Sequence, residues 1–227
     1  MAADLKNFYL EKRAEGWRLV DSRCAKPRYL EINLQKGSLG YRQKRLTQSK
    51  DPLKKILGIK FPPPPNTYLI DATAGLGKDA WLFAQLGLQV SAIERNELLY
   101  SLLAHALSQN TSQDFLKLYF GDSRHLIPQL AKTHHPAFIY LDPMFPPRLK
   151  SALVKKNMQM LEALVGEDPD AEELLEVSLK HATQRVIVKR PIYAPPLLKA
   201  PHFSNPGKTT RFDIYPTHTP HFTQIEV

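Results

Sequence analysis

The 227-residue sequence contains a single cysteine, Cys24. One thiol excludes an intramolecular disulfide framework and any zinc site built from several thiolates, and it is typical of a reducing compartment. No apolar run reaches the roughly 18 residues that a membrane-spanning helix needs, and no apolar core follows the first residues. We therefore expect a cytoplasmic protein that does not associate with a membrane.

Clustered metal ligands are also lacking. Eight histidines are present, but His134 and His135 precede a proline and the others are scattered. Carboxylates and thiols do not stand beside them at the spacing of metal ligands, so we expect no metal site.

Acidic residues are absent or rare in two stretches of this basic chain. The formal net charge is +9. Residues 36–60 contain eight lysines and arginines against one acid, and residues 185–212 contain six and no acid. Basic surfaces of this kind most often bind phosphate backbones, so we expect a nucleic-acid partner.

A proline run at residues 61–66 divides the sequence, because it can be neither helix interior nor central strand. We predict a small basic unit with β-strands over residues 1–61, including a strand at 29–34. The larger unit, 62–227, alternates apolar runs of strand length with helical stretches. The predicted strands are 68–70, 90–93, 116–120, 137–141 and 186–188, with helices near 78–86, 97–108, 149–164 and 171–182. A last strand, at 211–215, is expected to be antiparallel.

Alternation of strands and helices predicts an α/β fold of Rossmann-like type, with a mostly parallel sheet and helices on both faces. Ligands of such sheets bind outside the carboxyl ends of the strands. The first strand ends at Asp71 and is followed by Gly75 and Gly77 before a helix. These glycines permit a tight turn and a close approach of a ligand to the backbone. The pattern fits a dinucleotide site, an adenosyl site or a purely local turn.

Two further strand ends carry acids. Glu94 ends the next strand, where a carboxylate can accept hydrogen bonds from both hydroxyls of a ribose. Asp122 and Ser123 follow the third strand, where they can contact an adenine amino group or cap the next helix. Together with the glycine turn, Glu94 favours a cofactor that contains adenosine.

The fourth strand end distinguishes between cofactors. Asp142, Pro143 and Phe145 follow a buried strand. A methyltransferase that acts on a planar exocyclic amine needs acceptors for its N–H groups and an in-line approach to an activated methyl group. Asp142 and the carbonyl group of Pro143 can accept these bonds, and Phe145 can stack on the base. A nicotinamide enzyme has no need for this set of an acid, a proline and an aromatic residue.

These motifs together resemble a bacterial family, the S-adenosylmethionine-dependent guanine-N2 methyltransferases of small-subunit (16S) ribosomal RNA. The resemblance spans roughly residues 66–216 and is carried by five motifs. They are DATAGLGKDA from Asp71, IERN from Ile93, YLDPMFPP from Tyr140, SALVKK from Ser151 and VKRPIYAPPL from Val188.

The resemblance implies transfer of a methyl group from S-adenosylmethionine to the N2 amine of a guanine near the 3′ end of that RNA. It implies that the residues at the strand ends contact the cofactor, namely Lys78, Asp79, Glu94, Arg95, Asp122, Ser123 and Asp142. Asp142, Pro143 and Phe145 would receive the target amine. Ribosomal RNA or the assembling small subunit would be the partner.

We call the segment that begins at Asp142 and includes Pro143 and Phe145 the acceptor loop. Four basic residues near it are candidates for contacts to RNA phosphates: Lys155, Lys156, Lys189 and Arg190. Two alternatives remain open at this stage. An NAD(P)-dependent oxidoreductase would use the same glycine turn and Glu94. A non-catalytic RNA-binding protein would explain the charge without the acceptor loop.

Overall fold

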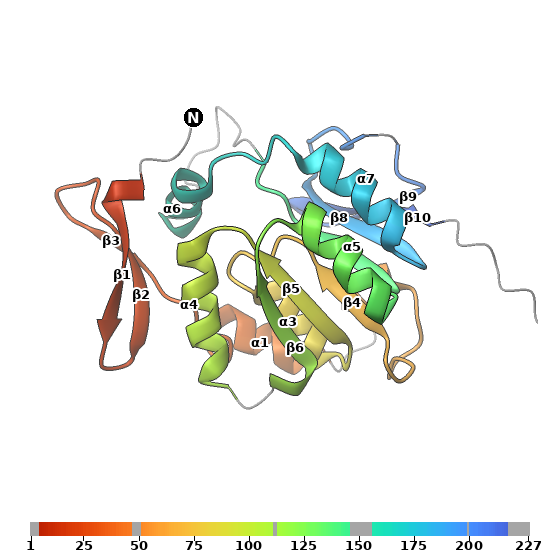
Figure 1. The fold of residues 1–227 in the computed structure, drawn as a ribbon, viewed down its shortest axis with the longest axis horizontal. Coiled ribbons are helices and arrows are strands. Elements are labelled where there is room, and N and C mark those ends of the chain that lie inside the picture. The colour runs from red at the N-terminus through yellow and green to blue at the C-terminus, as the bar shows by residue number, and fades with distance from the viewer. Residues whose placement is uncertain (1–4, 47–50, 111–112, 146–155, 199, 218–227) are drawn as a thin grey trace, which may run out of the picture.

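The computed structural model of the protein describes residues 5–46, 51–110, 113–145, 156–198 and 200–217. These residues form two β-sheets. A small antiparallel sheet has the order β1-β2-β3, and a seven-stranded sheet has the order β6-β5-β4-β7-β8-β10-β9. The small sheet lies at one end of the molecule beside α4 and α6 (Figure 1).

The strands of the small sheet are β1 (Phe8–Arg13), β2 (Gly16–Asp21) and β3 (Arg28–Leu30). Those of the large sheet are β4 (Tyr68–Asp71), β5 (Gln89–Glu94), β6 (Leu116–Phe120), β7 (Phe138–Leu141), β8 (Arg185–Pro191), β9 (Phe203–Pro206) and β10 (Thr210–Pro216). The α-helices are α1 (Gly37–Arg45), α2 (Pro52–Leu57), α3 (Lys78–Gln85), α4 (Glu97–Ser108), α5 (Ser123–His134), α6 (Lys156–Val165) and α7 (Ala171–His181). Two 3-10 helices are η1 (Leu5–Asn7) and η2 (Gln113–Phe115).

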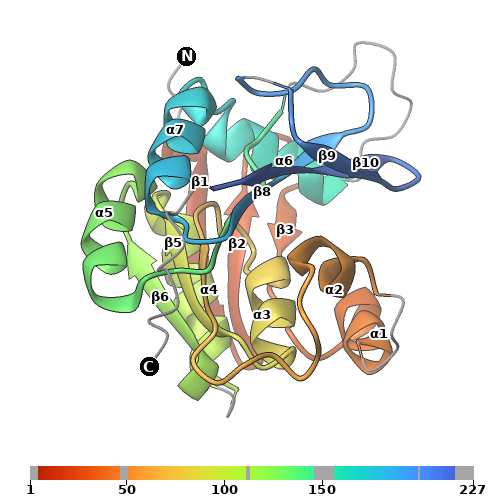
Figure 2. The ribbon, with the colours of Figure 1, turned by 90° about the vertical axis from the view of Figure 1, so that its right-hand side faces the viewer.

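The predicted α/β class is confirmed, because β4 to β8 pair in parallel and β10 pairs antiparallel with β8 and β9. Along each parallel strand, side chains alternate between the two faces. Leu69 and Phe138 pack on the face covered by α3, whereas Ile70 and Ile139 pack with α5 and α7. Figure 2 shows α3 and the pair α5 and α7 on opposite sides of the sheet.

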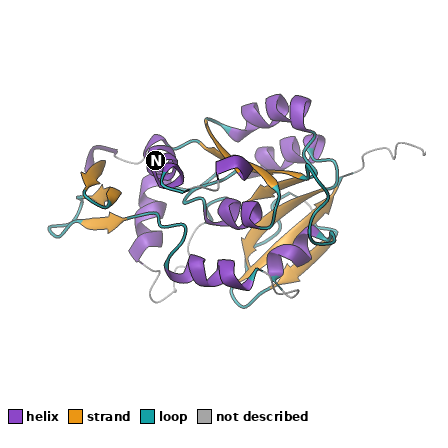
Figure 3. Cartoon of the chain, turned by 90° about the horizontal axis from the view of Figure 1, so that it is seen from below, coloured by secondary structure: helices purple, strands orange, loops and turns teal. Residues whose placement is uncertain are grey.

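The residues before the proline run contribute to two cores. Leu53 and Ile56 of α2 belong to the same buried cluster as Trp81 of α3. Leu19 and Leu30 of the small sheet pack instead against α4 and α6. Helices therefore separate the two sheets, as Figure 3 shows.

The first predicted strand, 29–34, is wrong at its end: β3 stops at Leu30. The carboxamide oxygen of Asn33 accepts hydrogen bonds from the backbone N–H groups of Gln35 and Lys36. This turn ends the extended segment and leads into α1. Of the predicted helix 149–164, residues 149–155 lie outside the described residues, and α6 accounts for the rest.

Gly77 is the N-cap residue of α3 and has a left-handed conformation, with a φ of 69°. A Cβ atom there would lie 2.4 Å from Cδ1 of Leu103 on α4. Glycine at this position therefore allows α3 and α4 to approach closely.

We expect Gly77→Ala to lower the free energy of unfolding by about 2–4 kcal/mol, through backbone strain and overpacking against Leu103. Gly166→Ala is a matched control, because Gly166 has a φ of 72° and a Cβ atom added there would meet no other atom within 4 Å. The free energy of unfolding of Gly166→Ala should be only about 1 kcal/mol below that of the wild-type protein. Urea unfolding measures both, and equal losses would show that the contact with Leu103 is unimportant.

Candidate active site

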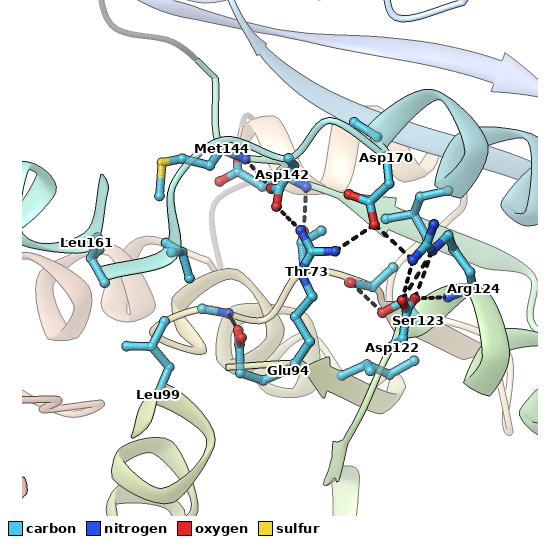
Figure 4. A pocket seen from close by; sticks show the side chains of 18 residues that line it. Thr73, Glu94, Leu99, Asp122, Ser123, Arg124, Asp142, Met144, Leu161 and Asp170 are labelled. Atoms are coloured by element: carbon cyan, nitrogen blue, oxygen red, sulfur yellow. Dashed lines mark hydrogen bonds and ion pairs between the residues drawn. The ribbon is translucent and has the colours of Figure 1, made fainter. Parts of the chain in front are cut away.

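A cavity opens at the carboxyl ends of β4, β5, β6 and β7, next to the segment between α6 and α7 (Figure 4). Its position at the carboxyl edge is the one expected for an open parallel sheet. Acidic side chains line part of it: Glu94, Asp122, Asp142, Asp168 and Asp170. Apolar side chains line another part: Ile93, Leu99, Leu161, Val165 and Leu174. The cavity thus combines hydrogen-bond acceptors with an apolar wall.

Glu94 is buried at the end of β5, and both of its oxygens are held by backbone groups. Oε2 accepts a hydrogen bond from the N–H group of Gly75, and Oε1 accepts one from that of Asn96, each at 2.7 Å. Burial raises the pKa of Glu94, although these two bonds oppose the shift. Each carboxylate oxygen has a further lone pair, so the group can still accept bonds from a ligand in the cavity.

Gly75 leaves space for a ligand to reach the Glu94 carboxylate. Its φ is 53°, and the atom nearest to an added Cβ would be the carbonyl oxygen of Thr73, at 3.9 Å. A ligand can therefore approach the backbone at Gly75 without meeting a side chain.

Asp122 and Ser123 lie where β6 passes into α5. Asp122 caps the helix by accepting a hydrogen bond from the N–H group of Arg124 at 2.9 Å, as one of the two sequence interpretations proposed. The hydrogen bond from the Arg124 side chain lowers the pKa of Asp122 to about 2. The Ser123 hydroxyl donates to the carbonyl group of Ala72 at 2.6 Å. Both residues line the cavity.

An ion-pair network joins the strand ends to the segment before α7. Arg95 pairs with Asp168 and, at 2.6 Å, with Asp170. Arg124 also pairs with Asp170, at 3.3 Å. The second oxygen of Asp168 accepts a hydrogen bond from the N–H group of Met144 at 2.6 Å. One carboxylate thereby connects the acceptor loop with a wall of the cavity.

Asp170 is the N-cap residue of α7, and Glu173 follows three residues later, which is the spacing of a capping box. The side chain of Asp170 nevertheless makes no capping hydrogen bond. The carboxylate of Asp170 is bound to the two arginines, which are stronger partners than a backbone N–H group.

A second cluster surrounds Lys189 on β8. Its ammonium group lies 2.7 Å from Oδ2 of Asp142 and 2.9 Å from Oδ2 of Asp79. Asp79 also accepts hydrogen bonds from the Tyr140 hydroxyl at 2.7 Å and from Arg42 at 3.3 Å. Although burial alone would raise it, these partners hold the pKa of Asp79 below its ordinary value. The two carboxylates raise the pKa of Lys189 despite its burial.

The remaining predicted cofactor residues lie outside the cavity lining. Asp79 belongs to the cluster around Lys189, Gly77 is buried beneath α4, and Lys78 is exposed at the first turn of α3. Asp71 is 1% exposed at the end of β4 and accepts a hydrogen bond from the N–H group of Thr73. Burial raises the pKa of Asp71 to about 8.

The four residues predicted to contact RNA phosphates lie in different surroundings. Lys189 is bound by two carboxylates, and Arg190 is 2% exposed, so neither presents a free charge at the surface. Lys155 lies outside the described residues. Lys156 begins α6, and its side chain is not among those described.

Several lining residues were missed by the sequence analysis. Thr73 accepts a hydrogen bond from the N–H group of Asp142 through its hydroxyl oxygen at 2.6 Å. Arg124, Met144 and Asp168 also line the cavity. Their only signal in the sequence is proximity to a strand end or, for Asp168, to the start of a predicted helix.

The described residues contain neither a candidate metal site nor a candidate membrane-spanning helix. No three histidine, cysteine, aspartate or glutamate side chains are grouped so that they could hold a metal ion. Within the same residues, no helix has the length and apolar character that crossing a membrane requires.

Comparison with known proteins adds the decisive observation. The model of a family described as "Putative SAM-dependent methyltransferase" matches residues 1–217. This chain belongs to that methyltransferase family. The assignment favours methyl transfer over the nicotinamide and non-catalytic alternatives, and it makes S-adenosylmethionine (SAM) the cofactor.

Named relatives share most of this methyltransferase's length. Ribosomal RNA small subunit methyltransferase J of Thioalkalivibrio sulfidiphilus is 42% identical over 84% of this chain and 77% of its own. The protein of the same name from Dechloromonas aromatica is 40% identical over 92% of this chain and 88% of its own. A solved structure of a SAM-dependent methyltransferase from Neisseria gonorrhoeae has a TM-score of 0.69 and 29% identity, with 93% of this chain and 84% of that chain covered.

The lining of the cavity fits SAM. Glu94 would offer carboxylate oxygens to the ribose hydroxyls, and Asp122 with Ser123 would meet an adenine amino group. The apolar wall, including Leu99 and Leu174, can cover the adenine ring.

We expect Glu94→Gln to weaken SAM binding by about 10- to 100-fold, because a hydrogen bond to a charged acceptor contributes roughly 1.5–3 kcal/mol. Glu97→Gln is the matched control, since Glu97 is exposed in the first turn of α4 and does not line the cavity. Its dissociation constant should stay within about twofold of the wild-type value. Isothermal titration calorimetry with SAM measures both variants, and equal affinities would remove Glu94 from the cofactor site.

Asp71 should make stability depend on pH. Its raised pKa means that the folded protein keeps a proton that the unfolded chain releases above about pH 4. Stability should therefore fall as pH rises from about 4 to about 8, at up to about 1.4 kcal/mol per pH unit, relative to Asp71→Asn. Urea unfolding of both proteins across this range tests the expectation, which parallel stability curves would contradict.

Proposed function

We propose that this methyltransferase transfers a methyl group from SAM to the exocyclic N2 amine of a guanine near the 3′ end of small-subunit ribosomal RNA. One observation carries the proposal: Asp142 lies at the junction of the SAM cavity and the acceptor loop, with its backbone and side chain both held in place. The relatives named ribosomal RNA small subunit methyltransferase J support RNA as the substrate class.

Bound SAM supplies a methyl group that is activated by its positively charged sulfur. Oδ2 of Asp142 accepts a hydrogen bond from Lys189. The carboxylate can still accept a further hydrogen bond, from an N–H group of the target amine. The carbonyl group of Pro143 can accept a hydrogen bond from the second N–H group of the amine. These acceptors orient the amine and stabilise the positive charge that develops on its nitrogen.

Lys189 has a positioning role in this proposal. Its ammonium group fixes the Asp142 carboxylate against the edge of the sheet and opposes the rise that burial causes in the pKa of Asp142, because a nearby positive charge favours the carboxylate form. The Phe145 ring follows Asp142 and Pro143 in the chain, is half-buried and can stack on the purine. The acceptors and the ring would together hold the guanine in line with the methyl group.

The test is transfer of a labelled methyl group from SAM to small ribosomal subunits, and to the free RNA, from cells that lack the modification. Nuclease digestion and mass spectrometry then identify the labelled nucleotide. We expect N2-methylguanosine near the 3′ end of the small-subunit RNA. Labelling of another nucleotide, or of none, would refute the proposal.

Asp142→Asn should reduce kcat by about 100-fold or more, because the amide presents an uncharged acceptor and a competing donor. SAM affinity should change much less, since Glu94 remains in place. Asp114→Asn, in the exposed 3-10 helix η2, is the control and should turn over normally. Retained activity in Asp142→Asn would exclude Asp142 from the chemistry.

A further inference from the structure

Arg190 is one of the largest fully buried side chains described, with 2% of its surface exposed. It follows Lys189 on β8, and neighbouring residues of a strand project to opposite faces. Lys189 contacts the carboxylates of the acceptor site, whereas the Arg190 guanidinium lies near the segment that follows β8. Its Nη2 donates to the carbonyl group of Pro195 at 2.6 Å.

The Arg190 guanidinium also stacks on the acceptor loop. Its Cζ atom lies 3.9 Å from the centroid of the Phe145 ring. A guanidinium at this distance attracts the face of an aromatic ring, and the attraction is stronger away from water. Arg190 therefore holds the aromatic residue that follows Asp142 and Pro143.

The other donors of Arg190 are unsatisfied. In the described part of the chain, Nε and Nη1 have no hydrogen-bond partner, and no carboxylate lies within ion-pair distance of the group. Its neighbour Arg211 differs, because it pairs with Asp213 at 2.8 and 2.9 Å and donates to three carbonyl groups. Burial lowers the pKa of Arg190, which reports the same unfavourable surroundings.

A buried charge with unmet donors does not stabilise a fold, and an apolar side chain of similar length fills such a space as well or better. Folding stability therefore gives no reason for an arginine at residue 190. The group that benefits is the ring it contacts.

We propose that Arg190 is a positioning residue, whose guanidinium fixes the plane of the Phe145 ring so that the ring receives the target base by stacking. The inference rests on the proposed function, because it assumes that a base enters beside Asp142. A ring held in advance loses less conformational freedom when the base binds. The contribution of Arg190 is thus made through Phe145 and not through contact with RNA phosphate.

The experiment compares Arg190→Met with the wild-type enzyme in three measurements. The urea midpoint of unfolding should be unchanged or higher, and the dissociation constant for SAM should stay within about twofold. The kcat/KM value for the RNA substrate should fall about tenfold or more, with most of the loss in KM, because stacking already forms in the bound ground state.

Arg185→Met is the matched control. Arg185 lies at the opposite end of β8, is partly buried and donates to the carbonyl group of Ile56 at 3.2 Å. It should leave the kcat/KM value for RNA within about twofold. An equal loss in both variants would indicate a general defect of the strand and would overturn the inference.

A double-mutant cycle tests the route through Phe145. In a Phe145→Ala background, Arg190→Met should change kcat/KM for RNA by less than about twofold, because the ring it positions is gone. If the double variant instead shows a loss of kcat/KM equal to the product of the two single-variant losses, the inference is overturned. Should Arg190→Met not fold, Arg190→Lys takes its place in the cycle, since lysine keeps the charge and loses the planar stack.

The two proposals fail differently in this experiment. If the wild-type enzyme does not methylate ribosomal RNA, the proposed function fails and the inference falls with it. If the wild-type enzyme is active and Arg190→Met is equally active, only the role of Arg190 is refuted.

Discussion

The pairing of Lys189 with two carboxylates is the interaction on which the site depends. Asp71 ends β4, Asp142 follows β7 and Asp79 lies in the first turn of α3 after β4, so the fold itself brings these three carboxyl groups close together at one edge of the sheet. Three neighbouring negative charges would repel one another strongly. The structure resolves this in two ways: Asp71 keeps a proton, whereas Asp79 and Asp142 share one ammonium group. Asp142 can thus remain an acceptor at a fixed position beside the SAM cavity.

Much of the fold could be predicted because its strands and turns follow from patterns of residues that are close in the sequence. Apolar runs of strand length and the glycine turn at Gly75 and Gly77 located the parallel sheet and its functional edge. The range of helix α5 was not predicted, because Pro128 interrupts its pattern, although Asp122 was interpreted as a possible cap of a following helix. The end of β3 was missed because the Asn33 turn is decided by side-chain hydrogen bonds to the backbone.

The site was predictable to the extent that its groups follow strand ends. Glu94, Asp122 and Asp142 all line the cavity. Long-range partners were not predictable, because nothing local indicates that Arg95 will meet Asp168 and Asp170 more than 70 residues later. The same holds for Lys189 and Arg190. They are simply two adjacent basic residues in the sequence, but alternation along β8 sends one to the carboxylates and the other beneath the Phe145 ring.

Asp168 holds Arg95 through one oxygen and the Met144 amide through the other. Arg95 lines the cavity proposed to hold SAM, whereas Met144 lies between Pro143 and Phe145, which are both proposed to meet the target base. A shift of either partner pulls on the carboxylate that restrains its counterpart. If binding of one substrate displaces either partner, the same carboxylate would transmit the displacement, and by thermodynamic reciprocity each substrate would then change the affinity for the other by the same factor.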